Sequence, residues 1–392
     1  MKRMRVLCLD GSGVYGLIEA RLLRGLCERD PEFLSPGNID LIAGCSAGSI
    51  NTLVMATEES PRELLLDGTL EKMWKDTQEW ADDSMMMNIG VMFGMTPFFT
   101  RTTTYSMMDK HFGKKRMRDL KQKVLISIFN WHGDEDHSAL AEWPDLEKKP
   151  FFVNAMEAYQ QNIKDLKKAS QRGEQTGYRG DKLWNFRRWG PTHFTNMVDG
   201  PEQDYYVSNV GYVAQTPPVA RPYQYGLGDG ASGNLSPAGL AFSWMFDHLR
   251  DKNGKAPPVD AISVLSVGDG AIIPFHWEKQ SYFNGAKWFQ KWPSNPQTGA
   301  WSSPSDYQFQ GSAEEDNEIV GRILQDRFYR LNPGLMHRPM VASTYSCGTP
   351  AGRDKVFKEI DAAFETRTAR DAMDQAAEFL RSDRWTQDRI RA

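Results

Sequence analysis

Short apolar runs alternate with helical periodicity at the start of the chain. Apolar residues at 4–9 and 39–43 are typical of two buried strands, and each is followed by a helical pattern, at about 17–29 and about 47–56. A strand, a turn and a helix, repeated twice within about 55 residues, indicate an α/β protein in which crossover helices connect parallel strands. The pattern therefore predicts an α/β fold with a mainly parallel central sheet.

The pattern continues less regularly along the rest of the chain. It predicts further strands at 124–129 and 261–267, and an amphipathic helix that Pro61 opens and that reaches about residue 80. Two segments interrupt it. Residues 84–100 are uncharged and carry five methionines, and residues 272–311 are rich in Trp, Tyr, Pro and Asn. We interpret both segments as insertions into the regular fold.

The length of the chain allows one large domain with an extension. At 392 residues it exceeds the usual domain size, but α/β domains reach this length when they carry insertions. We assign residues 1–312 to the main domain, with insertions at about 81–104 and 272–311. Residues 313–392 are charged and mostly helical in pattern, so we expect a C-terminal helical extension packed on the same domain.

Composition and charge exclude several classes of protein. The formal net charge of -4 argues against a partner that is a nucleic-acid duplex. The four cysteines show no metal-type spacing and suit a reducing cytoplasm. The chain has no run of about 20 apolar residues, which a membrane-spanning helix needs. The apolar run at 6–9 is too short for a signal-peptide core. We therefore expect a cytoplasmic protein.

The strongest candidate for chemistry is the pentapeptide GCSAG at Gly44–Gly48. It lies where an apolar strand turns directly into a helix, which is the context of the G-x-S-x-G nucleophile elbow. The glycines permit a tight turn, and the serine is held at the positive end of the next helix. Ser46 is therefore the candidate nucleophile. The alternative is a strand–helix turn that needs small residues only for packing.

A second small-residue loop, DGSGVYG at Asp10–Gly16, follows the first strand. Its glycines spell G-x-G-x-x-G, the fingerprint of dinucleotide binding. Asp10 argues against that reading, because its carboxylate would repel a pyrophosphate. The next strand also ends in Ala43-Gly44 instead of the acidic residue that binds a ribose. Backbone N–H groups that converge at a helix N-terminus equally suit an oxyanion, so no cofactor is expected here.

A serine nucleophile needs a general base, and the chain offers two kinds. A hydrolase triad would use a histidine after the serine, and His248, His276 and His337 are available. Only one predicted strand precedes the strand of Ser46, whereas α/β-hydrolases place several there. This order favours a carboxylate as the base.

Two aspartates lie in the same tripeptide, Asp-Gly-Ala. Asp229 sits in a glycine-rich turn, and Ser236 and Pro237 after it are a good N-cap and a good first residue for the following helix. Asp269 follows the predicted strand at 261–267, and ligand crevices in open α/β sheets form at the carboxyl ends of strands. Both aspartates are therefore candidates.

Taken together and in this order, the three motifs resemble those of the patatin-like phospholipases. That family's pattern is D-G-G-G-x-R-G, then G-x-S-x-G, then D-G-A/G. Asp10–Gly16, Gly44–Gly48 and Asp229–Ala231 match its three parts in turn, and the resemblance covers roughly residues 4–270 in scattered blocks. Each motif alone is weak, but the ordered set is specific.

The resemblance implies a three-layer α/β/α fold and hydrolysis of fatty-acyl esters by a Ser–Asp dyad, without a metal or cofactor. By position, Ser46 is the nucleophile and Asp229 is the base, which leaves Asp269 as a residue at the rim. The oxyanion-hole positions fall on Gly11, Ser12 and Gly13. Ser12 replaces a family glycine, and Tyr15 stands where the family usually has arginine, so a positive charge near the loop is missing.

A phospholipase A-type hydrolase acts on membrane phospholipid, so we expect a protein that is peripheral to a membrane. The segment at 84–100 and the basic run at 101–123 would make that contact, or they pack as core and as a solvated helix face. A carboxylesterase or thioesterase, and a non-enzymatic lipid- or nucleotide-binding module, are alternative functions. A small-ligand activator (such as a cyclic nucleotide), a protein activator and a homo-oligomer stay open.

Overall fold

The described part of the chain builds one mixed β-sheet. The computed structural model describes residues 3–76, 101–131, 137–143, 190–216, 226–249, 254–270, 304–336, 343, 347 and 350–386. Within these ranges seven strands form a sheet in the order β4-β3-β2-β1-β6-β7, and β5 pairs with β3. The strands are β1 (Met4–Leu9), β2 (Leu41–Cys45), β3 (Val124–Asn130), β4 (Gly190–Thr195), β5 (Leu227–Asp229), β6 (Ile262–Val267) and β7 (Phe328–Leu331).

The sheet is mainly parallel, as the sequence pattern predicts. β1 pairs in parallel with β2 and β6, β2 pairs with β3, and β6 pairs with β7. β4 and β5 run antiparallel to β3. The carboxyl ends of the parallel strands therefore lie along one edge, where the loops that follow β1 and β2 meet.

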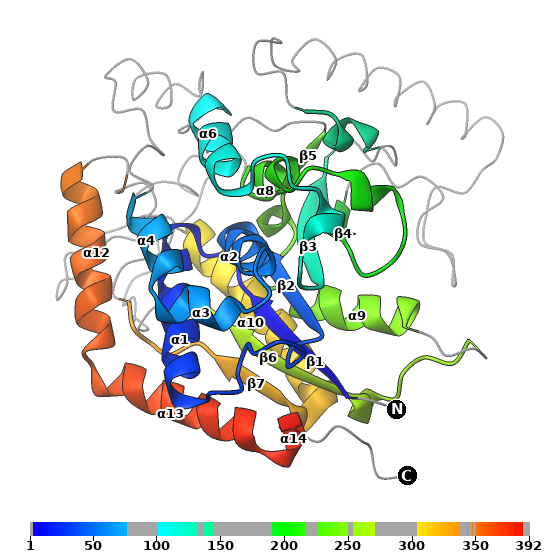
Figure 1. Ribbon diagram of the computed structural model, residues 1–392. Helices are drawn as coiled ribbons and strands as arrows, with labels where there is room; N and C mark the ends of the chain where they lie inside the picture. Colours follow the sequence, from blue (N-terminus) through cyan, green and yellow to red (C-terminus); the bar gives the residue numbers. More distant parts are fainter. Residues whose placement is uncertain are drawn as a thin grey trace.

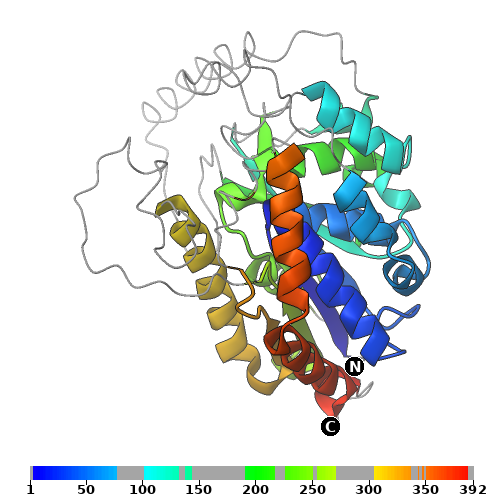
Figure 2. The same cartoon turned by 90° about the vertical axis from the view of Figure 1, so that its left-hand side faces the viewer.

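Helices cover both faces of the sheet, which confirms the predicted three-layer α/β/α fold. In Figure 1, α1 and α2 lie on one face and α9 and α10 on the other, and Figure 2 separates α10 from α1 in a second view. The helices with described bounds are α1 (Gly16–Arg29), α2 (Ser46–Ala56), α3 (Pro61–Leu66), α4 (Thr69–Asp76), α6 (Arg101–Phe112), α8 (Val207–Ala214), α9 (Ala238–His248), α10 (Pro304–Leu324), α12 (Pro350–Phe364), α13 (Arg367–Arg381) and α14 (Asp383–Thr386).

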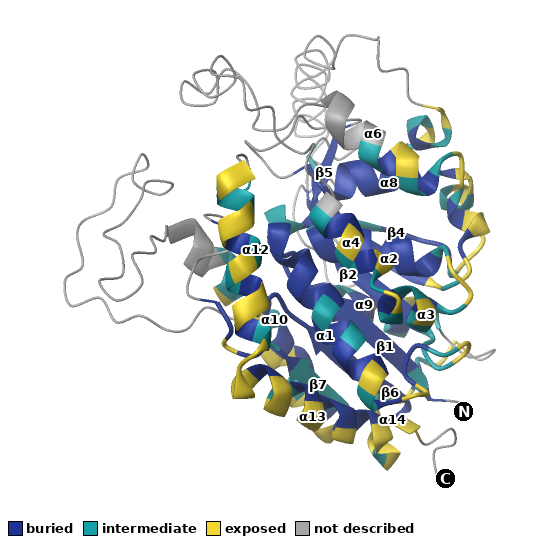
Figure 3. Ribbon diagram, turned by 60° about the vertical axis from the view of Figure 1, so that its left-hand side comes forward, coloured by how far each residue is buried: buried dark blue, intermediate teal, exposed yellow. Residues whose placement is uncertain are grey.

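The central strands are apolar throughout because both of their faces are buried. Along β1, Leu7 and Leu9 pack into the core on the side of α1 and α2. Val6 and Cys8 alternate with them and pack into a second core beneath α9 and α10. Figure 3 shows the buried strands between helices whose outer surfaces are exposed. This double burial explains the continuous apolar run that identifies the strand in the sequence.

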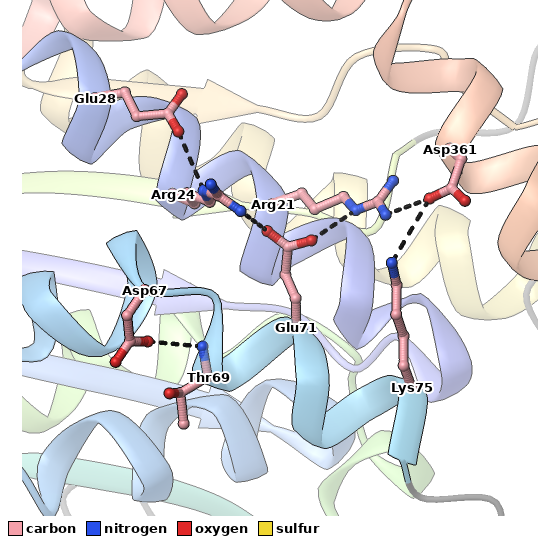
Figure 4. Close-up of polar contacts among 8 residues, drawn as sticks. All are labelled: Arg21, Arg24, Glu28, Asp67, Thr69, Glu71, Lys75 and Asp361. Carbon is pink, nitrogen blue, oxygen red and sulfur yellow. Dashed lines mark hydrogen bonds and ion pairs between the residues drawn. The ribbon is translucent and has the colours of Figure 1, made fainter.

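The helix predicted from Pro61 to about residue 80 is wrong in one respect, because the described part forms two helices. α3 ends at Leu66 and α4 begins at Thr69. Gly68 between them has a φ of +78°, a conformation that favours glycine and ends a helix. The backbone N–H of Thr69 donates to Asp67 Oδ1 at 2.8 Å, as Figure 4 shows, so the Asp67 side chain satisfies the first N–H of the new helix.

The C-terminal region contains the predicted helices and also a strand. α12, α13 and α14 lie within it, but residues 328–331 form β7 at the edge of the sheet. α10 begins at Pro304 and continues through residue 312, where we placed the boundary of the extension. The methionine-rich segment at 84–100 and residues 271–303 lie outside the described residues. Within the described ranges, every helix is too short or too polar to cross a membrane.

A cluster of charges joins α12 to α1 and α4. Arg21 on α1 pairs with Glu71 on α4 at 3.1 Å and also with Asp361 on α12. Arg24 pairs with Glu71 at 3.2 Å, and Lys75 lies 4.0 Å from Asp361 (Figure 4). The pairs of Asp361, whose side chain is 53% exposed, each contribute little, about 0–1 kcal/mol. Together they fix where α12 crosses α1 and α4.

Candidate active site

Ser46 lies at the junction of β2 and α2, as the motif predicts. Cys45 has extended dihedral angles, whereas Ser46 has a φ of +48°, in the left-handed region that few residues other than glycine adopt. α2 begins at Ser46, so the hydroxyl group is at the positive end of the helix dipole. The turn therefore presents a strained, partly exposed serine at the carboxyl edge of the sheet.

The two glycines of the elbow are required by close backbone approaches. A Cβ on Gly44 would lie 2.5 Å from the carbonyl oxygen of Gly48, and a Cβ on Gly48 would lie 2.4 Å from the carbonyl oxygen of Leu9. Gly48 N also donates to the carbonyl of Asp10 at 3.2 Å. Small residues thus let the start of α2 pack directly on the end of β1, so the packing and the elbow readings of this turn are compatible.

Asp229 is the acidic group that contacts Ser46. The Ser46 hydroxyl donates to Asp229 Oδ2 at 2.6 Å, across 183 residues of chain. Asp229 is fully buried at the end of β5, and its Oδ1 accepts from the backbone N–H of Ala231 at 2.9 Å. One carboxylate oxygen is therefore held by the backbone, and the other faces the serine.

The turn after Asp229 packs tightly on β3. A Cβ on Gly230 would lie 2.4 Å from Ser127 Oγ, so only glycine fits at this position without a shift. Within the sheet, Asp229 is opposite Ile128 in the antiparallel pair of β3 and β5. The sheet itself therefore brings the carboxylate beside the elbow.

The Asp10–Gly13 loop lies against the same serine, but its three predicted donors are not equivalent. A Cβ on Gly11 would lie 3.1 Å from Ser46 Cβ. The N–H of Gly11 donates to the carbonyl of Leu235 at 2.7 Å, so that amide is already bonded. Within the described part of the chain, the amides of Ser12 and Gly13 donate to no backbone carbonyl. Gly13 has a φ of +51°, which turns the chain into the following helix.

Tyr15, at the position of the family arginine, is part of the core. Its hydroxyl group is 2.6 Å from Ser343 Oγ, and both side chains are buried. A positive charge still reaches the loop, because Arg330 Nη2 lies 2.6 Å from Asp10 Oδ2. Burial raises the pKa of Asp10 to about 6, although Arg330 acts in the opposite direction. Sequence reasoning missed Arg330, which comes from β7 near the other end of the chain.

The thiol next to Ser46 lies in surroundings that disfavour its ionised form. Cys45 is buried, and its Sγ donates to the carbonyl of Asn234 at 3.3 Å. Burial, reinforced by the charge of Asp229, raises the pKa of the Cys45 thiol well above its ordinary value. The thiolate that would attack a carbonyl is therefore suppressed.

Asp269, which the sequence places at the rim, is buried. Its side chain makes no hydrogen bond to Ser46 among the described contacts, and burial followed by the charge of Asp10 raises its pKa to about 7. Gly270 beside it would meet Ile18 and Leu335 if it carried a Cβ. Asp269 thus lies in the packed region behind the Asp10–Gly13 loop. Among the described residues, no group of three or more His, Cys, Asp or Glu side chains is placed to hold a metal ion.

The His248→Ala variant should keep ester hydrolysis within about tenfold of wild type, far from the roughly 10⁴-fold loss expected for a triad member. His248 stacks on Trp244 at the end of α9, and its Nδ1 is 3.1 Å from the Trp244 carbonyl. α9 has 11 residues, and its first turn follows Leu235, whose carbonyl holds the Gly11 amide. His248, at the other end of α9, is therefore about 15 Å from that first turn. Steady-state kinetics would check this, and a large loss in a folded variant would restore a triad. His276 and His337 lie outside the described residues.

Comparison with known proteins places the chain among its relatives. The model of the patatin-like phospholipase family matches residues 7–201, which include Ser46 and end before Asp229. Protein teg of Priestia megaterium is 23% identical over 362 residues, 86% of this chain and 89% of that protein. "Putative sporulation hydrolase CotR" of Bacillus subtilis is 24% identical over 273 residues, 69% of this chain and 64% of that protein. With the predicted motifs and the three-layer fold, this match shows that the chain belongs to the patatin-like phospholipase family.

Proposed function

We propose that the protein is a phospholipase A-type serine hydrolase that cleaves fatty-acyl esters of membrane phospholipids through Ser46 and Asp229. The observation that supports this most directly is the 2.6 Å hydrogen bond from the Ser46 hydroxyl to Asp229 Oδ2 on a left-handed elbow. The family match supports lipid acyl esters as the substrate class. A hydroxyl group bonded to a buried carboxylate is the arrangement that activates a nucleophile.

The acylation step would transfer the Ser46 proton to Asp229 while Oγ attacks the ester carbonyl. Collapse of the tetrahedral intermediate breaks the ester bond, and the lysophospholipid alcohol leaves with the proton from Asp229. A water molecule then attacks the acyl-enzyme, Asp229 takes its proton, and Ser46 Oγ leaves with that proton as the fatty acid is released. The bond from Ala231 N to Oδ1 holds the carboxylate in place through both steps.

The oxyanion of each intermediate would rest on the amides of Ser12 and Gly13. These donors lie in the loop that contacts Ser46, whereas the Gly11 amide is bonded to Leu235 and shapes the loop. One well-placed donor is worth about 3 kcal/mol of transition-state stabilisation. Because backbone groups make the hole, the replacement of a family glycine by Ser12 leaves the donors intact.

Phospholipid vesicles incubated with the protein should release fatty acid and lysophospholipid in equal amounts, measured by lipid mass spectrometry. If the reaction passes through an acyl-enzyme, added methanol should divert part of the product to fatty-acid methyl ester, because an alcohol competes with water for the same intermediate. Cleavage of short soluble esters or thioesters with vesicle lipids left intact would instead indicate a carboxylesterase or thioesterase. Lipid binding without any product would indicate a binding module.

A further inference from the structure

A buried ion pair connects β7 to the loop beside the nucleophile. Arg330 lies opposite Ser266 in the parallel pair of β6 and β7, and its Nη1 donates to Ser266 Oγ at 3.0 Å. Its Nη2 is 2.6 Å from Asp10 Oδ2 and 2.6 Å from Glu314 Oε1 on α10. The side chain of Asp10 is 4% exposed and that of Arg330 is 15% exposed. The pair is therefore shielded from water, where a charge without a partner is costly.

The backbone groups of Asp10 also hydrogen-bond to β6 and to the start of α2, so Asp10 is held by both its side chain and its backbone. Its N–H donates to the carbonyl of Val267 at 3.1 Å, and its carbonyl accepts from Gly48 N at 3.2 Å. Its other carboxylate oxygen, Oδ1, has no hydrogen-bond partner among the described residues. The guanidinium of Arg330, at 2.6 Å from Oδ2, makes the short contact to this side chain, and Ser236 is a second polar neighbour that, against the effect of burial, lowers the pKa of Asp10. The amides of Ser12 and Gly13 follow two and three residues later.

α10, which packs beside β6 and β7 (Figure 1), also hydrogen-bonds to residues 236–239 at the start of α9. Its Asp316 Oδ2 accepts from Gly239 N at 2.7 Å, and Asn317 Nδ2 donates to Ser236 Oγ at 3.1 Å. Ser236 follows Leu235, whose carbonyl holds the Gly11 amide. One turn of α10 therefore connects to the first two residues of the Asp10–Gly13 loop, to Asp10 through Arg330 and to Gly11 through Ser236 and Leu235.

We propose that Arg330 is a positioning residue for this hydrolase: its ion pair with Asp10 holds the Asp10–Gly13 loop so that the Ser12 and Gly13 amides face the oxyanion. The inference rests on the proposed function. It assigns a catalytic support role to a strand outside residues 7–201, which the family model matches. Oxyanion donors are sensitive to small shifts, because a displacement of about 1 Å can cost about 100-fold in rate.

The Arg330→Gln variant should lose on the order of 100-fold in kcat on a short soluble ester with KM nearly unchanged, comparable to the loss of one oxyanion donor. Arg330→Lys, which keeps a positive charge, should recover most of that loss. The matched control is Arg322→Gln on α10, where an arginine that is 78% exposed pairs with Glu318 and touches no part of the site.

The rate and extent of labelling by a fluorophosphonate distinguish a positioning role of Arg330 from a loss of folded protein. If Arg330 positions the loop, Arg330→Gln should label to completion but at a much lower rate, because phosphonylation also places negative charge on the oxyanion hole. The opposite result is that only a fraction of the Arg330→Gln molecules is labelled, at the wild-type rate, and that this fraction equals the remaining activity. Arg330 would then only stabilise the fold, and the proposal would be overturned. Equal rates for Arg330→Gln, Arg322→Gln and wild type would overturn it as well.

A double-variant cycle tests the pair itself. Asp10→Asn and Arg330→Gln should each lower kcat, and the double variant should lose about as much as the worse single variant, since both remove one interaction. Multiplicative losses would show that the two residues act independently and would contradict the proposal. Activity that survives Ser46→Ala would instead overturn the proposed function, so the two failures are distinguishable.

Discussion

Ser46→Ala should abolish ester hydrolysis, with a loss of at least about 10⁴-fold in kcat, while the protein stays folded. The change removes the hydroxyl that donates to Asp229, so no nucleophile remains at the elbow. The backbone strain at φ +48° is borne equally by serine and alanine, which argues for an unchanged turn. Steady-state kinetics on a p-nitrophenyl ester, together with thermal unfolding, would measure both effects.

Covalent labelling provides the control for this variant. A fluorophosphonate should modify the wild type at Ser46, and Cys45→Ala should label as well as the wild type, because burial keeps that thiol protonated. Peptide mass spectrometry identifies the labelled residue. Modification at Cys45, or activity that survives Ser46→Ala, would contradict the elbow assignment.

Asp229→Asn should abolish turnover, whereas Asp269→Asn should keep at least about a tenth of it, a barrier change of no more than about 1.4 kcal/mol. The two residues share the tripeptide Asp-Gly-Ala, so the substitutions are matched in sequence context and size. An amide at 229 can still accept from Ser46, but it cannot take the proton. Asp269 is buried behind the loop, with no hydrogen bond to Ser46 among the described contacts. Values of kcat on the same ester would rank the two variants.

The stability of Asp269→Asn tests independently whether Asp269 is a buried structural group and not the base. Burial raises the pKa of Asp269 to about 7, above the ordinary value of 3.8. The folded state therefore binds this proton more tightly than the unfolded state, and ionisation at higher pH costs stability. The variant should gain more stability over wild type at pH 8 than at pH 5, and the gain should vanish below about pH 4. A reversed ranking of kcat between the two variants would assign the base to Asp269.

The first two strand–helix units could be predicted closely from the sequence. The strand expected at 4–9 is β1, and the helices expected at about 17–29 and 47–56 are α1 and α2 to within one residue at each end. The strand expected at 39–43 is β2, which begins and ends two residues later. Their signals are local, because burial on both faces requires continuous apolar strands and a helix that covers a sheet needs one apolar side. The elbow is equally local, since Ser46 and its glycines are adjacent in sequence.

β7 was missed because it has no such local signal. It is four residues long, and Leu331 alone among them is fully buried. A short strand with partly exposed residues lacks the apolar run that identifies β1, so pairing with β6 decides its conformation. The same reason hides Arg330, whose position in the sheet brings it to Asp10.

The sequence by itself therefore determined the fold class, the elbow and the family. The first two depend on residues that are near one another along the chain, and the family depends on the order of three short motifs. The family resemblance favoured Asp229 over Asp269, and the tertiary structure decided how the carboxylate of Asp229 comes to meet Ser46. β5 runs antiparallel to β3 and ends beside the elbow, while Asp269 follows β6 and is buried behind the loop. It also decided that Gly11 bonds to Leu235 and that Arg330 reaches Asp10. These contacts join distant segments, and their partners are set by sheet order and packing, which no local pattern encodes.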